Sequence, residues 1–423
     1  MVVKDFGFKG SFFDKNETLE REVREKVLFK NFSQRIKNIV DVSKGWNNIL
    51  SGIDLSKINS REDLIQLPIT KKSSFPLLQK NAFPFGNLNT KPYNQFPFMF
   101  ASPGPIYEPG NKNDFWNMSR SLYAAGLREK DIAYNTFSYH LGPAGIMMQQ
   151  ACNNVGCTVI PGGIGNTELQ LETIKNLRPS FYLGTPSFLK ILLEKSKEKK
   201  IDISSLKKGL VGAEPFPPPL REKLAEEGVD VVQMYGIAEI GCIAYETKDS
   251  RNNLTEGMLI EEDVILEIVR PGTSKSLPPG EVGEIVVTKI NSDYPMIRLG
   301  TGDLSKIIID PSPCGRTNFR IHGWMGRADQ STKFKGIFVT PDQINKITDS
   351  FKEISKVKFV INTKELLDNG ELFCETNIHD VELQNKVKEF FKSNFKLNIN
   401  VSLVKKGDIL NDGLVIQDKR VLN

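Results

Sequence analysis

The central part of the chain alternates short apolar runs with amphipathic stretches. Between Asp131 and Gly236, apolar runs are separated by segments in which apolar side chains recur every three or four positions. This alternation predicts β-strands joined by crossover helices, and therefore an α/β fold with a doubly wound, mostly parallel sheet. The expected strands are 132–137, 157–163, 180–185, 207–214 and 229–236, and the expected helices are 145–156, 167–177, 186–199 and 217–228.

The segments before residue 131 follow a less regular pattern. Residues 17–40 carry apolar side chains at helical spacing among charges, which predicts one amphipathic helix. Prolines and glycines in the second half of 95–110 indicate an apolar run that ends in a stiff loop. The two other expected helices are 60–67, closed by Pro68, and 113–125, capped by Asn113 or Asp114.

The pattern changes again after Glu239. Short β runs at 264–269, 283–290, 296–300 and 304–309, with glycine and proline turns, predict a small β subdomain. From Gly326 onwards, further β runs and two helices predict a compact α+β unit, with the helices at 341–351 and 381–395. We therefore expect two domains, a large one over residues 1–326 and a small one over 327–423.

Composition narrows the range of functions. Lys plus Arg total 56 against 51 for Asp plus Glu, without a dense basic cluster, so we expect anionic small ligands and no nucleic acid. No apolar stretch is long enough for a membrane span or a signal sequence, which favours a cytoplasmic protein without membrane contact. The five cysteines are odd in number and scattered, and the three histidines stand far apart, so neither a disulfide framework nor a histidine metal site is expected.

A tyrosine, a glycine and a glutamate follow the apolar run 229–232, at Tyr235, Gly236 and Glu239. In an open α/β sheet, ligands bind at the carboxyl ends of the strands. A tyrosine ring there can stack on a purine or flank an acyl group, and a carboxylate is a hard oxygen ligand suited to Mg²⁺ between phosphates. A plain joint between a strand and a helix is the alternative interpretation.

Three further segments are candidate sites. Residues 212–215 end an apolar strand, and their small side chains allow a flat ring to approach the backbone. Asp303 lies in a glycine-containing turn, where an exposed carboxylate can accept both hydroxyls of a ribose. Arg327 and Asp329 stand at the domain junction, where an arginine can pair with phosphate or ribose oxygens and the joint can act as a hinge. A simple turn and an ordinary linker are the competing explanations.

Taken in order, these segments resemble those of a known family. The chain is similar to phenylacetate-CoA ligases, within the adenylate-forming superfamily of acyl-CoA synthetases, from about residue 17 to its end. The matching runs are LPITKK, SLYAAGLREKDIAYNT, VIPGGIGNTELQLETI, GTPSF, GAEPF, MYGIAE, GMLIEED, GEVGEIVVT, MIRLGTGDL, CGRT, GRADQ and KRVLN.

The resemblance implies a fold, a reaction and cofactors. The large domain would be an AMP-binding domain that combines the doubly wound sheet with the small β subdomain, and the small domain would be mobile. The enzyme would join a carboxylic acid to AMP from ATP and then transfer the acyl group to CoA, with Mg²⁺ as the metal. An aromatic or compact organic acid is the expected substrate, and a homodimer is one assembly that stays open.

The resemblance also implies site residues, position by position. Those implied in catalysis are Glu239, which would also hold Mg²⁺, Arg327 and Lys419, with Asp329 as the hinge. Those implied in nucleotide binding are Ser102, Gly104, Gly212, Ala213, Glu214, Pro215, Gln233, Tyr235, Gly236, Asp303 and Arg327. Those implied in binding the acid are Tyr139, His140, Gly142 and Tyr235.

The chain departs from the family at the phosphate loop. Where the family has Ser-Ser-Gly-Thr-Thr-Gly-Lys-Pro, this chain has Ser-Pro-Gly-Pro-Ile-Tyr-Glu-Pro, from Ser102 to Pro109. A unit charge about 4 Å from another is worth roughly 4 kcal/mol at an effective dielectric constant near 20, so reversing the lysine charge beside a triphosphate should matter. Either Glu108 turns away, or it reaches Mg²⁺, or ATP binds weakly.

Two other departures concern a lysine and a zinc site. The catalytic lysine of the family aligns with Gln417, and Lys419, two positions further on, would point to the same side of a strand, about 7 Å away. Only one of the four ligands of a structural zinc found in some relatives is kept, so we expect no zinc and a buried, inert Cys314 thiol. The four aligned positions are Thr247, Leu259, Ser312 and Cys314.

The acid pocket differs as well, because residues 139–142 read Tyr-His-Leu-Gly where the family has Tyr-Gly-Leu-Phe. Because this phenyl ring is lost, the sequence does not identify the acid that binds. Two other functions also stay open: a homologue that binds acyl-CoA or a nucleotide without ligating it, and an enzyme that passes the acyl group to another acceptor. The altered phosphate loop and Gln417 favour the first of these. The residues that oppose it are Tyr235, Glu239, Asp303 and Arg327.

Overall fold

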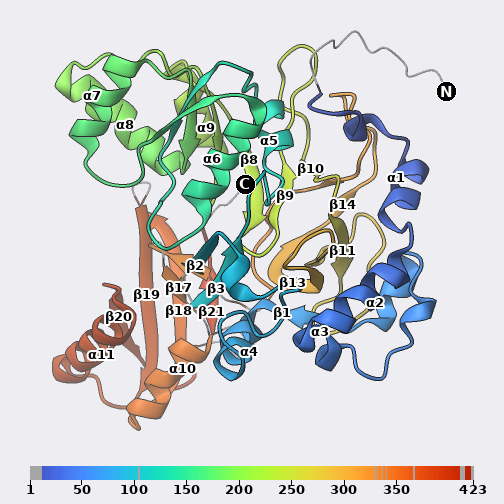
Figure 1. Cartoon of the computed structure of the whole chain (residues 1–423). Helices are drawn as coiled ribbons and strands as arrows, with labels where there is room; N and C mark the ends of the chain where they lie inside the picture. Colours follow the sequence, from blue (N-terminus) through green and yellow to red (C-terminus); the bar gives the residue numbers. More distant parts are fainter. Residues whose placement is uncertain are drawn as a thin grey trace. The chain divides into compact units, whose positions relative to one another are not determined.

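The structure of the chain is a computed structural model that describes residues 12–102, 105–328, 330, 332–335, 337–339, 341–364, 367–409 and 415–420. It divides into two compact units, Met1–Met325 and Gly326–Asn423 (Figure 1). Each unit has a hydrophobic core of its own, which is the mark of a domain. That the second unit moves as a domain stays a prediction.

The first unit carries the helices and strands that position the candidate site. Its helices are α1 Arg21–Leu28, α2 Phe32–Val42, α3 Lys44–Ile49, α4 Phe75–Asn81, α5 Ser119–Ala124, α6 Ala144–Val155, α7 Thr167–Leu177, α8 Pro186–Lys199 and α9 Pro218–Glu226. Its strands are β1 Thr70–Lys71, β2 Phe98–Ser102, β3 Ile106–Gly110, β4 Ile132–Asn135, β5 Thr158–Pro161, β6 Phe181–Gly184, β7 Lys208–Val211, β8 Asp230–Ile237, β9 Gly241–Tyr245, β10 Met258–Ile260, β11 Ile265–Val269, β12 Gly283–Lys289, β13 Met296–Ser305, β14 Ile307–Ile308 and β15 Arg320–Ile321.

The large sheet of this unit has the strand order β14-β15-β10-β9-β8-β7-β6-β4-β5. Strands β4 to β8 run parallel to their neighbours within this group. Successive side chains of a strand point to opposite faces, and along β6 Phe181 joins a cluster with Met147 of α6, whereas Tyr182 joins another with Leu189 of α8. Helices therefore cover both faces of the sheet (Figure 1), and the predicted doubly wound α/β fold is confirmed.

The region after Glu239 contributes to two sheets. The expected small β subdomain is a four-stranded sheet with the order β1-β13-β12-β11. Strands β9, β10, β15 and β14 extend the large sheet, and β9 runs antiparallel to β8. The run expected at 296–300 lies in β13, which continues to Ser305 because register shifts against β12 let the ladder pass the glycine-rich stretch. The run expected at 304–309 is divided between the end of β13 and the separate strand β14.

Two helices expected near the N-terminus have different boundaries. The helix expected over 17–40 is divided into α1 and α2, because Asn31 adopts a left-handed conformation with a φ of 53°. The helix expected over 113–125 begins only at Ser119. Asp114, one of the two expected caps, accepts hydrogen bonds from the backbone N–H groups of Met118 at 2.8 Å and Ser119 at 3.0 Å.

The stiff loop expected at the end of 95–110 is in fact the second strand of a β-hairpin. Strand β2 pairs with β3 from Phe98 and Gly110 to Ser102 and Ile106. The hairpin is a two-stranded sheet, so a proline can occupy its outer edge, where the missing N–H is not needed. Gln79 of α4 fixes β3, since it accepts from the Tyr107 N–H at 2.8 Å and donates to the Tyr107 carbonyl at 2.7 Å.

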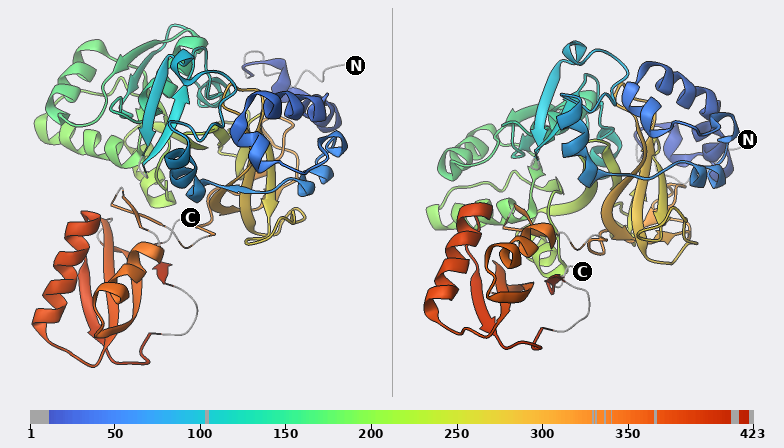
Figure 2. Two further views of the ribbon diagram at one scale, coloured as in Figure 1. Left: turned by 60° about the horizontal axis from the view of Figure 1, so that its bottom comes forward. Right: turned by 90° about the horizontal axis from the view of Figure 1, so that it is seen from below.

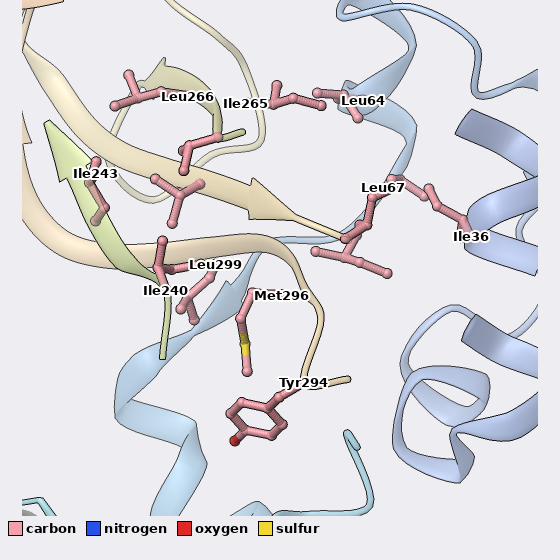
Figure 3. Packing of buried hydrophobic residues seen from close by; sticks show 14 of the residues in the cluster. Ile36, Leu64, Leu67, Ile240, Ile243, Ile265, Leu266, Tyr294, Met296 and Leu299 are labelled. Carbon is pink, nitrogen blue, oxygen red and sulfur yellow. The ribbon is translucent and has the colours of Figure 1, made fainter. Parts of the chain in front are cut away.

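The core beside the small sheet joins the N-terminal segments to its strands. Leu64 and Leu67 pack between Ile36 of α2 and the small sheet, and Met296 of β13 lies beside the ring of Tyr294 (Figure 3). Strand β1, which follows this segment, pairs with β13. This packing fixes the chain that leads directly into Lys72 and α4.

The second unit consists of β16 Thr332–Phe334, β17 Ile337–Val339, α10 Pro341–Ser350, β18 Ile354–Lys364, β19 Leu367–Thr376, α11 Val381–Phe395, β20 Asn400–Val404 and β21 Ile416–Asp418. Its sheet has the order β20-β19-β18-β21. Helix α11, whose bounds are those predicted, runs along this sheet (Figure 2), and Val387 and Phe391 pack into a core with Phe359. Helix α10 ends one residue before its expected end.

Candidate active site

The carboxyl ends of the parallel strands gather several predicted residues at one edge of the large sheet. Residues 212–215 follow β7, and the side chain of Gln233 on neighbouring β8 donates to the Glu214 carbonyl at 3.2 Å. The Glu214 carboxylate accepts from the Ser187 N–H at the start of α8, at 2.6 Å. A Cβ at Gly212 would lie only 2.6 Å from the Met234 sulfur. This close approach explains why the position needs glycine.

The structure joins Tyr235 to Asp303, two residues predicted to bind the nucleotide. The Tyr235 hydroxyl donates to Asp303 Oδ2 at 2.7 Å, and the Trp324 indole N–H donates to Asp303 Oδ1 at 2.9 Å. Both donors are neutral, and they hold the Asp303 carboxylate of β13 beside Tyr235 of β8. The two donors orient it in the way that binding to the hydroxyls of a ribose requires.

The expectation of an exposed Asp303 in a turn is wrong. The side chain is on strand β13 and the residue is only 8% exposed. The glycines that indicated a turn serve a bulge instead, where the Gly302 N–H donates to Glu284 Oε1 at 3.0 Å. On the same strand, the fully buried Arg298 pairs with Glu267 of β11 at 2.9 Å, which anchors β13 and therefore Asp303.

Glu239 is held in a tight turn between β8 and β9. The Trp116 indole N–H donates to the Ala238 carbonyl at 3.0 Å, and the Lys289 ammonium donates to the Ile240 carbonyl at 2.9 Å. The carboxylate of Glu239 is buried, and its Oε2 pairs with Lys72 Nζ at 2.9 Å. Its Oε1 has no hydrogen-bond partner among the described residues. One buried oxygen of this carboxylate is thus left unpaired by the described part of the protein.

Glu108, in the phosphate-loop hairpin, does not turn away to solvent. It is fully buried on β3, and its Oε2 accepts a hydrogen bond from the Ser102 hydroxyl at 2.9 Å. Burial, together with the negative charge of nearby Glu239, raises the pKa of Glu108 to about 8. Like Glu239, it has an Oε1 without a partner in the described part of the chain. Gly104, expected in the same loop, lies outside the described residues.

The predicted acid-binding residues follow β4, at the same edge of the sheet. Asn135 donates to the Tyr139 hydroxyl at 2.8 Å, and burial raises the pKa of Tyr139 to about 12. His140 is exposed, and the neighbouring Leu141 carbonyl accepts from the Ala101 N–H of β2 at 2.9 Å. Residues 139–142 therefore lie against the hairpin of β2 and β3.

Three predicted residues belong to the second unit. Lys419 is exposed and lies one residue beyond the end of β21, and whether its side chain points to the same side as Gln417 stays a prediction. Its N–H donates to the Ile361 carbonyl at 2.8 Å, and the next residue, Arg420, binds Asp368 at 2.7 Å. Arg327 lies near the start of this unit, and Asp329 lies outside the described residues.

The positions that align with a structural zinc site contain a hydrogen-bonded cluster. The Ser312 hydroxyl lies 3.1 Å from the Cys314 sulfur, and the Thr247 hydroxyl lies 2.7 Å from that of Thr255. Cys314 is buried as predicted. Burial alone raises its pKa, yet the Arg316 guanidinium and the neighbouring hydroxyls outweigh burial and lower the pKa below its usual value.

Two site residues escaped the sequence prediction. Lys72 pairs with Glu239, which lies 167 positions further along the chain. Lys72 belongs to the matching run LPITKK, but no role was predicted for it. Trp324 contacts Asp303 from 21 positions away, and no motif singled it out.

Comparison with known proteins identifies the class. Residues 116–291 match the family of AMP-binding enzymes. The chain is 29% identical to the phenylacetate-coenzyme A ligase of Thermus thermophilus, over 85% of this chain and 83% of that protein. It is also 29% identical to the phenylacetate-coenzyme A ligase of Escherichia coli K12, over 75% of this chain and 77% of that protein.

A solved structure agrees on the fold. The crystal structure of 2-hydroxyisobutyryl-CoA ligase in complex with 2-HIB-AMP and CoA has a TM-score of 0.82 and 21% identity, over 97% of this chain and 93% of that one. The fold and the matched domain define an adenylate-forming enzyme. Within that superfamily, the chain is similar over most of its length to phenylacetate-coenzyme A ligases. Over the residues described, no helix is both long and apolar enough to span a bilayer.

Proposed function

We propose that this chain is an AMP-forming ligase that joins an aromatic or otherwise compact carboxylic acid to CoA through an acyl-adenylate. The observation that carries this proposal is the hydrogen bond between Tyr235 and Asp303 at the carboxyl edge of the large sheet, in an AMP-binding domain. The phenylacetate-coenzyme A ligases among its relatives support the choice of CoA as the acceptor.

The reaction has two steps at one site. A carboxylate oxygen of the acid attacks the α-phosphorus of ATP, and pyrophosphate leaves with the electron pair of the broken P–O bond. The CoA thiol then loses its proton and attacks the acyl carbon, and AMP leaves. Tyr235 and residues 212–215 would contact the adenine and the acyl group. Asp303, oriented by Trp324, would bind the ribose, and residues 139–142 would line the acid pocket.

Glu239 fits the metal that such a reaction uses. Its buried Oε1 has no hydrogen-bond partner among the described residues, and a carboxylate oxygen is the donor that Mg²⁺ prefers. A Mg²⁺ ion bound there would neutralise charge on the phosphates of ATP. Lys72, on the other oxygen of the same carboxylate, would add a second positive charge to the same region.

For the second unit, we assign Arg327 to the nucleotide, Lys419 to the positive charge that Gln417 cannot supply, and Asp329 to the hinge. Lys419 is exposed, so its side chain is able to reach a ligand. We also assign the enzyme to the cytoplasm and leave its assembly, as a monomer or a homodimer, to measurement by light scattering.

The test is pyrophosphate–ATP exchange over a panel of aromatic, branched and hydroxylated acids, followed by mass detection of the CoA thioester. Exchange and thioester formation with the same acid support the ligase. Exchange without a thioester in the presence of CoA indicates another acceptor. Absence of exchange with every acid, together with measurable binding of CoA or nucleotide by calorimetry, contradicts the proposal.

The last outcome describes the second candidate, a homologue that binds without ligating. The burial of a carboxylate, Glu108, where the family has a lysine favours it. Exchange assays on Glu108→Lys and Gln417→Lys separate the two candidates. If the wild type is inactive and Glu108→Lys gains exchange, the altered loop has removed the activity. If the wild type is active and Glu108→Lys loses exchange, Glu108 is part of the working site.

A further inference from the structure

Two buried glutamates at the candidate site each have one oxygen without a partner. Glu108 on β3 is fully buried, and Glu239 in the β8–β9 turn is 4% exposed. Among the residues that the structure describes, the Oε1 atoms of both lack a hydrogen-bond partner. A buried carboxylate oxygen left unpaired is costly, so such an atom usually has a ligand that completes it.

The two carboxylates lie close enough for their charges to interact. The negative charge of Glu239 acts on Glu108, the charge of Lys72 acts on Glu108 in the opposite direction, and both glutamates act on the hydroxyl of Tyr294. Lys72 contacts Glu239 directly at 2.9 Å, whereas the direct partner of Glu108 within the described residues is Ser102, whose hydroxyl donates to it at 2.9 Å. When both carboxylates are ionised, their two negative charges therefore face a single ammonium within the described part of the chain, that of Lys72.

Rigid elements hold both carboxylates in place. Gln79 of α4 fixes the backbone of β3 beside Glu108 through two hydrogen bonds to Tyr107, and Lys72 lies just before the same helix. Trp116 and Lys289 fix the turn that carries Glu239. A site whose ligands are held in this way needs little reorganisation when an ion binds.

We propose that Glu108 and Glu239 together bind one Mg²⁺-type divalent cation through their Oε1 atoms, before any nucleotide arrives. Glu108 would thus be a second metal-binding carboxylate, and the phosphate loop would attract the triphosphate through this cation instead of through a lysine. The inference rests on the proposed function for the identity of the cation and of the phosphate ligand. The binding itself requires no catalysis.

The donor set suits Mg²⁺ or Mn²⁺ better than a transition metal of the zinc type. Within the described part of the chain, no group of three or more His, Cys, Asp or Glu side chains could hold a metal. Mg²⁺ is commonly bound by one or two carboxylates, with waters and substrate phosphates in the other positions. A dicarboxylate site of this kind leaves open the positions that a triphosphate would fill.

The test measures Mn²⁺ binding to the full, nucleotide-free chain at pH 8.5, by the loss of the free-ion signal in electron paramagnetic resonance. We expect one site with a dissociation constant on the order of 10⁻⁴–10⁻³ M, which Mg²⁺ displaces. Glu108→Gln and Glu239→Gln should each weaken it at least about tenfold. Lys72→Met should tighten it roughly two- to tenfold, because a competing positive charge is removed.

Glu262→Gln is the matched control. Glu262 is also buried and also has an Oε1 without a partner among the described residues, but its Oε2 pairs with Arg24 at 2.5 Å. We expect this variant to keep the wild-type affinity for Mn²⁺. Circular dichroism melts check that each variant is folded. Lys72→Met adds a second check, because general damage to the fold would weaken Mn²⁺ binding and not tighten it.

Three results would overturn the inference. They are no Mn²⁺ binding by the wild type up to about 10 mM, which is beyond the weak end of carboxylate sites; equal affinity in the wild type and folded Glu108→Gln; and equal loss in Glu108→Gln and Glu262→Gln. Pyrophosphate exchange by the wild type in any of these cases leaves the proposed function intact. Conversely, Mn²⁺ binding that depends on Glu108 in a protein without exchange supports the inference and contradicts the ligase.

Discussion

Two buried acidic regions of the first unit are partnered in different ways. In the first region, Glu262 pairs with Arg24 at 2.5 Å, and Glu261 pairs with Arg120, which also binds Asp14 at 2.8 Å. In the second region, at the candidate site, Glu239 shares a single half-buried lysine with Glu108, whose direct partner is a hydroxyl. Burial raises the pKa of Glu262 to about 7, and burial with the charge of Glu239 raises the pKa of Glu108 to about 8.

The two regions differ in the source of the positive charge that pairs with their carboxylates. Arg24 and Arg120 donate hydrogen bonds to carboxylates in fixed geometry, so each glutamate of the first region has a cation from the protein itself, although one oxygen of each has no partner among the described residues. This region joins the N-terminal segment to the sheets and serves folding. In the second region, the described residues place one ammonium beside two carboxylates, and the proposed cation would supply the further positive charge once Glu108 loses its proton. A buried acid alone therefore does not mark a functional site; the charges around it must be counted as well.

The largest loss of folding stability is expected from replacing an arginine in the first region. Arg24→Met leaves the buried carboxylate of Glu262 without its cation, and breaking such a pair costs roughly 3–5 kcal/mol. Urea denaturation at pH 7 should show this loss in the free energy of unfolding. The Mn²⁺ affinity of the folded variant should stay unchanged.

A double variant checks the cause. Arg24→Met combined with Glu262→Gln removes the stranded charge, so it should recover part of the lost stability. A double variant as unstable as Arg24→Met alone would mean that lost packing of the arginine, and not the unpaired charge, accounts for the effect.

The second effect is a pH dependence that Glu108 imposes on the cation-free protein. Because the pKa of Glu108 is raised to about 8 from a usual value of 4.5, the folded state binds this proton more tightly than the unfolded chain. Its contribution therefore favours folding at low pH and is lost as pH rises from about 5 towards 8. A tenfold difference in proton affinity is worth roughly 1.4 kcal/mol, so the loss over this range of pH reaches about 3 kcal/mol.

Comparison with Glu108→Gln isolates this contribution, since other buried acids are common to both proteins. With EDTA present, the variant should be more stable than the wild type at pH 8.5 but not at pH 5.5, as judged by urea denaturation. Adding Mg²⁺ at pH 8.5 should stabilise only the wild type. Parallel curves for the two proteins at every pH would show that Glu108 titrates normally.

The sequence predicted those features that local patterns determine. The apolar alternation between residues 131 and 236 predicted strands β4 to β8 and the helices between them, because each element there buries a face with its own period. The hairpin β2–β3 was missed, since its prolines look like a loop when the free edge of a two-stranded ribbon is unknown. Asp303 was placed in a turn because a bulge and a turn use the same glycines.

The candidate site could be predicted only through the resemblance to a family. Tyr235 and Asp303 are 68 positions apart, and Lys72 and Glu239 are 167 apart; nothing local in the sequence links such residues. The charge reversal at Glu108 was visible, but not its burial beside Glu239. That burial depends on how the hairpin packs against α4, which is a tertiary contact.

A third prediction tests the single lysine of the site. Lys72→Met should cost about 1–2 kcal/mol without cations, less than Arg24→Met, because Lys72 is 31% exposed and water already screens its charge. Thermal melts with EDTA should show the loss, and 10 mM Mg²⁺, about an order of magnitude above the affinity expected for carboxylate sites, should restore most of it. A loss that Mg²⁺ leaves unchanged would mean that Lys72 acts mainly through packing.

The smallest loss of stability is expected from removing one hydrogen bond to Asp303, a buried carboxylate with a neutral donor on each oxygen. Tyr235→Phe removes the hydroxyl 2.7 Å from Oδ2 but leaves the Trp324 hydrogen bond to Oδ1. Tyr235 is half-buried, so water can replace the hydroxyl, and we expect a loss of roughly 1 kcal/mol in stability. The KM for ATP in the exchange assay should rise more than kcat falls, because the ribose site loses its orientation. The substitution retains the aromatic ring, so a fall in kcat alone would assign the Tyr235 hydroxyl to the chemical step instead of to nucleotide binding.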